Sequence, residues 1–291
     1  MKSKKNKRRI PIAPYVMIAV QLSLLVLFGF YPFAKTILAT FSATTRFGEF
    51  IKFIGLKNWI RMFTNEEFLT MIVRTLAFAA MCLVMSLAIA MIFALLTVNT
   101  GKGNKVHQLL FSLPMIIASA PMASIWRFFL RQNGGILNSI LGLDINWLGD
   151  TSIVLVVMAV LCSWGHIASV YLYLLVGFRN VPDELIEAAK IDGAGWWART
   201  FRIMMPMASP QIFYVLFLNI TWSFKVFGQI KLLTGGGPAN ATCTLIVSIF
   251  NRGVVQGQFE YACCEALVLF ALIFAATRLQ FAAEKKFVHY Q

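Results

Sequence analysis

Residues 183–206 read DELIEAAKIDGAGWWARTFRIMMP and interrupt an otherwise strongly apolar chain with a polar segment. Four of the twelve acidic residues of the chain lie in its first ten positions. Pro182 and the acids that follow favour a helix start, since proline fits the first turn and carboxylates suit the positive end of the helix dipole. Helix-forming residues continue through Lys190, and Gly193 and Gly195 favour the end of the helix. The pattern predicts a short water-exposed helix that is presented to a partner.

The composition indicates that the rest of the chain resides in a membrane. The 291 residues are 59% hydrophobic and 13% charged, with a mean hydropathy of +0.73, whereas soluble domains average about 45–50% apolar and about 25% charged residues. Runs of about 20 apolar residues are long enough to cross a bilayer core about 30 Å thick, and only helices satisfy their own backbone hydrogen bonds there. We expect an all-α polytopic membrane protein, one domain over 1–291, with six transmembrane helices. They are predicted at about 14–36, 72–98, 108–130, 152–177, 209–231 and 261–283.

The positive charge of the chain indicates an orientation rather than a nucleic-acid partner. The formal net charge is +14, but the cations gather beside the apolar runs and not on one soluble face. Residues 1–9, MKSKKNKRR, precede the first run, whose apolar core is too long for a signal peptide. The positive-inside rule therefore places the N-terminus in the cytoplasm, and six crossings return Lys285 and Lys286 to the same side. The 178–208 loop also falls inside.

The motifs of 178–208 carry a family resemblance. Glu187-Ala188-Ala189 is followed after three residues by Gly193, and the segment ends in Ile203, Met205 and Pro206. This order resembles the EAA loop of the binding-protein-dependent ABC importer permeases, with Met205 in place of the usual Leu. The resemblance implies the type I ABC importer permease fold and makes this segment a coupling helix that sits in a cleft of an ATPase subunit.

The side chains of the four candidate ATPase-coupling residues, Glu187, Ala188, Ala189 and Gly193, suit that role. Ala188 and Ala189 leave a helix face without bulk, Glu187 offers a charge to a partner, and Gly193 ends the helix. A plain amphipathic cytoplasmic loop is the alternative interpretation.

Two further segments narrow the resemblance toward carbohydrate importers. Residues 232–250, LLTGGGPANATCTLIVSIF, resemble the LTxGGP segment of carbohydrate-type permeases, and residues 53–59, FIGLKNW, resemble a second segment of that branch. The shape of the chain is similar to the first permease subunit of glycerol-phosphate and maltose-like systems, and equally to many oligosaccharide permeases. A sugar or oligosaccharide is the expected solute, and glycerol phosphate or an acidic saccharide is the alternative.

The resemblance also implies partners and a location. They are a second homologous permease subunit, two ATPase subunits that bind ATP and magnesium, an external solute-binding protein, and the lipid of a bacterial cell membrane. This chain has no G-x-x-x-x-G-K-[ST] sequence, so we expect no ATP hydrolysis by it. We expect no cofactor, catalytic residue or metal ligand in it either. Its five cysteines lack CxxC spacing and are expected to be small buried apolar residues.

The fifth apolar run contains the candidate substrate contacts. Lys225 is an intramembrane cation, which usually faces a bundle interior or a water-filled cavity. Asn219, Trp222, Lys225 and Gln229 recur at intervals of three, three and four, near one helical face. An indole and hydrogen-bonding groups suit a sugar, and a cation suits a phosphate or an acidic sugar. Lys225 snorkelling to the interface, or pairing with an acid of the partner permease, is the alternative. Members of the family often have an acid at the position of Gly228, so substrate contacts cannot be copied across.

Other polar residues of the apolar runs have simpler interpretations. Trp164 and His166 are expected to pack with hydrogen bonds, with substrate contact as the alternative. Arg74 is expected to snorkel at the outer end of the second run. Arg127 and Arg131 are expected to anchor the third run at the interface.

Two other function classes fit the sequence less well. A stand-alone ion-coupled carrier predicts inverted repeats and acids within the spans, but Glu265 is the only acid inside a predicted span. A membrane-embedded enzyme predicts a catalytic constellation, and none is recognisable.

Overall fold

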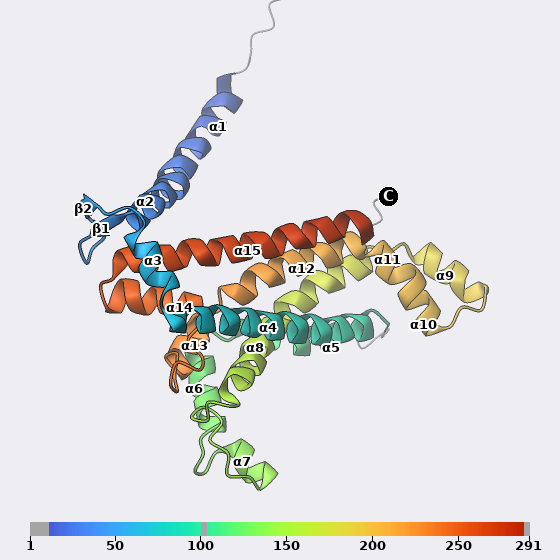
Figure 1. Cartoon of the computed structure of the whole chain (residues 1–291). Coiled ribbons are helices and arrows are strands. Elements are labelled where there is room, and N and C mark those ends of the chain that lie inside the picture. Colours follow the sequence, from blue (N-terminus) through green and yellow to red (C-terminus); the bar gives the residue numbers. More distant parts are fainter. Residues whose placement is uncertain (1–11, 100–103, 288–291) are drawn as a thin grey trace, which may run out of the picture.

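The computed structural model describes residues 12–99 and 104–287. The basic cluster at 1–9, on which the predicted orientation rests, and residues 288–291 lie outside the described residues. Helices dominate the described part (Figure 1).

Among the described residues, four helices are long and apolar enough to cross a membrane, and they correspond to four of the expected spans. The first combines α1 (Ile12–Leu25), η1 (Val26–Phe30) and α2 (Tyr31–Thr40), and its spanning part is Met17–Thr40. The others are α4 (Glu66–Asn99), α8 (Val154–Arg179) and α15 (Phe259–Phe287). Three of them cover their predicted runs, with α4 beginning six residues earlier than its run, and α8 begins two residues later than its run.

The third and fifth expected spans are each divided between helices that meet at a break. In the third, α5 (Asn104–Ser112) and η2 (Leu113–Ile116) meet α6 (Ser119–Phe129) at a bend of 95°. Pro114 opens η2, and Ala118 has extended backbone at ψ 155°, so the helical hydrogen bonds cannot continue. The described part of the chain has six spans if each bent pair of helices counts as one.

The fifth expected span, 209–231, consists of α12 (Ser209–Phe224) and α13 (Gly228–Leu233), with an interruption between them. A helical part that precedes the expected span consists of α10 (Trp196–Arg199), η3 (Thr200–Met204) and α11 (Met205–Met207). This part meets the expected span at 70°, just before Pro210, which occupies the first turn of α12. Lys225 then has φ −104° and ψ 8°, which ends α12 before α13 begins.

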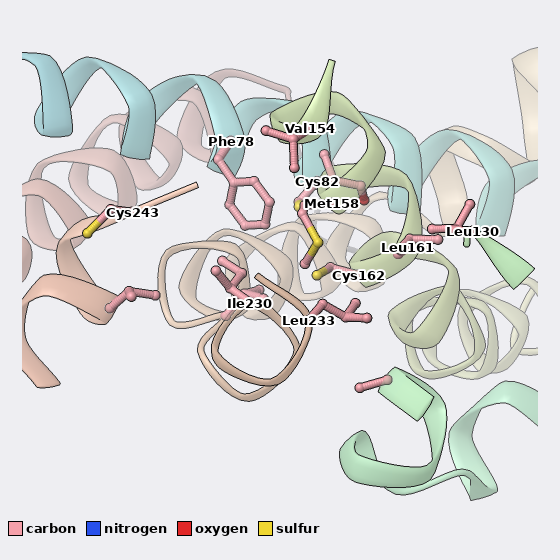
Figure 2. Close-up of a cluster of buried hydrophobic side chains, with 14 residues drawn as sticks. Phe78, Cys82, Leu130, Val154, Met158, Leu161, Cys162, Ile230, Leu233 and Cys243 are labelled. Atoms are coloured by element: carbon pink, nitrogen blue, oxygen red, sulfur yellow. Dashed lines mark hydrogen bonds between the residues drawn. The ribbon is translucent and has the colours of Figure 1, made fainter. Parts of the chain in front are cut away.

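The long helices pack around three clusters of buried side chains. One cluster joins α4, α8 and α13, and Figure 2 shows Phe78, Cys82, Met158, Cys162 and Ile230 converging from these elements. A second cluster lies farther along α4 and α8. The third joins α4, α12 and α15. All five cysteines are free and buried, which confirms the sequence interpretation.

Short elements cap the two ends of the helical bundle (Figure 1). One end carries α3 (Lys57–Phe63), α14 (Leu245–Phe250), η4 (Asn251–Val255) and a hairpin of β1 (Ser42–Thr44) with β2 (Phe50–Phe53). The hairpin pairs Ser42 with Phe53 in an antiparallel register and is an exception to the expected all-α structure. The opposite end carries α9 (Asp183–Ile191) and α10 (Figure 1). Helix α7 (Ile136–Leu141) lies beyond α6.

Candidate functional site

Helix α9 contains the predicted coupling motif and begins where the sequence indicates. Pro182 precedes its first turn, Asp183 and Glu184 lie in that turn, and Lys190 lies in the last. Each charge has the sign that the helix dipole favours at its end.

The end of α9 explains the spacing between the EAA residues and the glycine. The amide of Ala194 donates to the carbonyl of Ala189 at 2.8 Å, and the amide of Gly193 donates to that of Lys190 at 3.1 Å. These two bonds form a Schellman motif, whose C′ residue adopts a left-handed conformation. Gly193 has φ +78°, and a Cβ at this position would meet no atom within 4 Å. The glycine is therefore required by its backbone conformation and not by lack of space.

The surface of the coupling segment differs in part from the expected one. Glu187 and Ala188 are exposed, whereas Ala189 is only 8% exposed, so of the two alanines only Ala188 is available to a partner. Four large apolar side chains that were not among the predicted coupling residues are also exposed: Ile191 at 87%, Trp197 at 68%, Phe201 at 52% and Leu185 at 43%. Their signal in the sequence was the presence of large apolar residues inside a polar loop.

A cavity of about 310 Å³ lies between the start of α6, the middle of α8 and the break between α12 and α13. Trp222, Lys225 and Gln229, three of the four predicted substrate contacts, line it. The imidazole of His166 on α8 stacks on the indole of Trp222, with ring centroids 3.7 Å apart and planes 5° apart. His166 also lines the cavity, a position that favours substrate contact, the alternative to a packing role.

Gly165 lets the cavity wall close around Gln229. A Cβ at Gly165 would lie 3.1 Å from the side-chain nitrogen of Gln229 and 3.1 Å from Met122. The same nitrogen of Gln229 donates to the sulfur of Met122 at 3.1 Å. The glycine thus sets the width of the cavity at this point.

Asn219 lies elsewhere, away from the residues with which it was grouped. Its side chain is fully buried, and its Nδ2 donates to Oγ of Ser86 on α4 at 2.9 Å. Because α12 ends at Lys225, the predicted helical face does not continue from Asn219 to Gln229. Asn219 instead fastens α12 to α4.

The remaining basic residues and Trp164 have definite partners or positions. Arg74 is half-buried and donates to the carbonyl of Cys243 at 3.2 Å, so it ties α4 to the loop after α13. Burial raises the pKa of the Cys243 thiol, which therefore stays protonated. Arg127 donates to the carbonyl of Leu232. Arg131 is exposed. Trp164 packs edge to face on Trp126, with ring centroids 5.4 Å apart.

Glu265, the acid inside a predicted span, is fully buried and paired. It lies 3.2 Å from Nε of Arg252 on η4 and accepts a hydrogen bond of 2.9 Å from Ser248. The guanidinium of Arg252 also lies 4.3 Å from the centroid of the Tyr261 ring. Through these contacts Glu265 helps to hold η4 against α15.

Known proteins resemble this chain over nearly its whole length. The sn-glycerol-3-phosphate transport system permease protein UgpA of Agrobacterium fabrum is 30% identical over 285 residues, which cover 96% of this chain and 97% of the relative. The protein of the same name from Yersinia enterocolitica is 30% identical over 284 residues, 96% of each chain.

Solved structures show the same fold. A chain of a bacterial alginate ABC transporter, solved in complex with an alginate pentasaccharide-bound periplasmic protein, superposes with a TM-score of 0.83 at 20% identity, covering 94% of both chains. A chain of a second structure, of a bacterial ABC transporter involved in the import of the acidic polysaccharide alginate, superposes with a TM-score of 0.81 at 20% identity. The match covers 93% of this chain and 95% of that chain. The expected ABC importer permease fold is confirmed. Residues 86–289 match the family model described as binding-protein-dependent transport system inner membrane component, and the chain belongs to this family.

Proposed function

We propose that the chain is the membrane-spanning permease subunit of an ATP-driven importer for a sugar or oligosaccharide. The observation that carries this proposal is the capped helix α9 with its EAA spacing, at the opposite end of the bundle from the hairpin (Figure 1). The 182–204 loop couples closure of the ATPase subunits to alternating access. The N- and C-termini lie in the cytoplasm with this loop.

The chain works with partners that supply what it lacks. Two ATPase subunits bind ATP and magnesium, and no cofactor is held by this chain. Glu187, Ala188 and the exposed Ile191 and Trp197 form the surface for one ATPase subunit. Such a surface suits an interface, because a few large anchors, tryptophan prominent among them, supply most of the binding energy of a contact.

A second, homologous permease completes the membrane part. An 18-residue window within Met17–Thr40 has none of its residues buried, so another helix or lipid must cover it. An external solute-binding protein delivers the solute. The path runs between the two permeases, and the cavity with His166, Trp222 and Lys225 forms this chain's share of it.

An acidic solute, such as glycerol phosphate or an acidic saccharide, is the second candidate. Lys225 supports it, because this exposed cation lines the cavity beside the stacked rings of His166 and Trp222. A cation that lines a cavity attracts an anionic group through their opposite charges. The names of the relatives, which include sn-glycerol-3-phosphate permeases, point the same way.

Uptake by the reconstituted complex tests the proposal. The complex of both permeases, the ATPase subunits and the binding protein is placed in liposomes, and uptake of neutral oligosaccharides, acidic oligosaccharides and glycerol phosphate is measured. ATP-dependent uptake of one of these solutes is expected. ATP-independent uptake driven by an ion gradient would contradict the proposal and favour a carrier.

A further inference from the structure

The hairpin of β1 and β2 carries large apolar side chains that the described part of the chain leaves uncovered. Phe47 at its turn is 86% exposed and Phe53 is 72% exposed. Phe50 and Ile51 are exposed as well, so both faces of β2 are bare. A strand in a soluble protein normally buries one of its faces, and an isolated hairpin is barely stable in water.

Hydrogen bonds fix this hairpin to the ends of two membrane spans. Asn58, which is buried, donates to the carbonyl of Thr40 at 3.1 Å and to that of Ser42 at 3.0 Å. Thr40 is the last residue of α2. On the other side, Thr44 donates to the carboxylate of Glu260 in the first turn of α15 at 2.8 Å.

The turn of the hairpin packs closely against the start of α15. A Cβ at Gly48 would lie 2.7 Å from the ring of Phe259, the first residue of α15, so only glycine permits this approach. The hairpin therefore lies at the level where α2 ends and α15 begins. For two spanning helices, that level is the boundary between the hydrocarbon core and the lipid headgroups.

Cations alternate with the apolar residues of the hairpin. Lys52 stands between Ile51 and Phe53, and Lys57 follows at the start of α3; both lysines are exposed. Residues 41–65 contain four cations and one acid. Aromatic rings at headgroup level and lysines that extend toward phosphate oxygens are typical of segments that lie in a membrane interface.

We propose that this hairpin is a membrane-interface anchor. Phe47, Phe50 and Phe53 enter the leaflet at the end of the molecule opposite α9, and Lys52 and Lys57 bind anionic lipid headgroups. The position of the hairpin directly beside the ends of two spans, and the exposed lysines next to its aromatic rings, favour lipid over a protein partner. The anchor holds the end of α2, and thereby the α1–α2 helix, at a fixed depth.

Depth measurement by spin labelling tests the position of the hairpin. A nitroxide is attached to the full chain, in its complex in lipid nanodiscs, at Phe53→Cys, at Phe50→Cys and at the control Thr151→Cys, an exposed loop position. The unsubstituted chain, whose cysteines are buried, gives the background. Compared with the label at 151, the labels at 50 and 53 are expected to be relaxed less by a water-soluble nickel chelate. Their relaxation by oxygen, which partitions into the bilayer, is expected to persist. Chelate relaxation at 50 and 53 equal to that at 151 would overturn the proposal.

Lipid retention tests the headgroup contacts. A complex whose chain carries both Lys52→Gln and Lys57→Gln is purified from mixed phosphatidylglycerol and phosphatidylcholine. The control complex carries both Lys52→Arg and Lys57→Arg and keeps both charges. The glutamine variant is expected to lose about fivefold in phosphatidylglycerol preference at this site per lysine removed. The arginine control is expected to keep that preference. Equal enrichment in the two variants would refute the role of the lysines.

Discussion

Replacing Gly193 by alanine should weaken the docking of the ATPase subunits through backbone conformation alone. The φ of Gly193 is +78°, and an added Cβ would meet no atom within 4 Å, so no steric contact with the rest of the chain contributes. A side chain in the left-handed region costs about 1–2 kcal/mol. That cost falls on the Schellman turn, which positions Glu187 relative to α10.

The size of the effect follows from the population of the native turn. When only a fraction of a segment is in its binding conformation, the apparent affinity equals the intrinsic affinity multiplied by that fraction. A cost of about 1–2 kcal/mol lowers the ratio of competent to incompetent conformers by a factor of about 5–30. We therefore expect the apparent affinity of the ATPase for Gly193→Ala to fall by up to that factor, and solute-stimulated ATP hydrolysis to fall with it.

Gly195 supplies a matched control two residues away. It too is exposed and would meet no atom within 4 Å with a Cβ, but its φ of −65° and ψ of 170° are ordinary for alanine. Titration of purified ATPase subunits against the permeases in nanodiscs measures the affinity of Gly193→Ala, Gly195→Ala and the unchanged chain. Gly195→Ala should bind as the unchanged chain does. Equal affinities for both alanine variants would refute the reasoning.

Three other substitutions test the cavity and the buried ion pair. Arg252→Leu should destabilise the protein by about 3–5 kcal/mol, because it leaves the Glu265 carboxylate buried without its cation. The double variant Arg252→Leu with Glu265→Leu should recover much of this stability, as measured by thermal unfolding. A double variant as unstable as the single one would contradict this. Gly165→Ala should push Gln229 into the cavity and raise the KM for uptake, with ATPase binding unchanged as its control readout. Lys225→Met should reduce uptake of an anionic solute about 10-fold or more while Lys225→Arg retains it; equal uptake of neutral and anionic solutes by Lys225→Met would return Lys225 to a snorkelling role.

The sequence predicted the elements whose signal is local. Apolar runs of sufficient length located four spans, because burial in lipid depends on composition more than on tertiary contacts. Gly193 marked the end of α9 correctly, since a left-handed C′ position selects glycine wherever it occurs. Pro114 was a visible signal for the bend before α6, but the length of the apolar run obscured it.

The parts that the sequence did not predict depend on contacts between distant segments. Lys225 ends α12 without a proline nearby, so helical periodicity grouped Asn219 with the cavity although it binds Ser86 on α4. His166 comes from another span, and nothing in its own neighbourhood indicates that it stacks on Trp222. Pairings of this kind arise only when the helices pack.

The course of the chain between the two candidate sites suggests how they communicate. Helix α12 follows directly on the coupling segment through the bend at Ser209, and its other end is Lys225 at the cavity. Asn219 fixes the middle of α12 to α4 through Ser86. A displacement of α9 and α10 by the ATPase can therefore reach Trp222 and Lys225 in two ways: as a rotation of α12 about this fastened point, or as a joint movement of α12 with α4. The two-part fifth span favours rotation, because the breaks on either side of α12 leave it as a separate rigid segment, and packed helices change between discrete arrangements more readily than they deform.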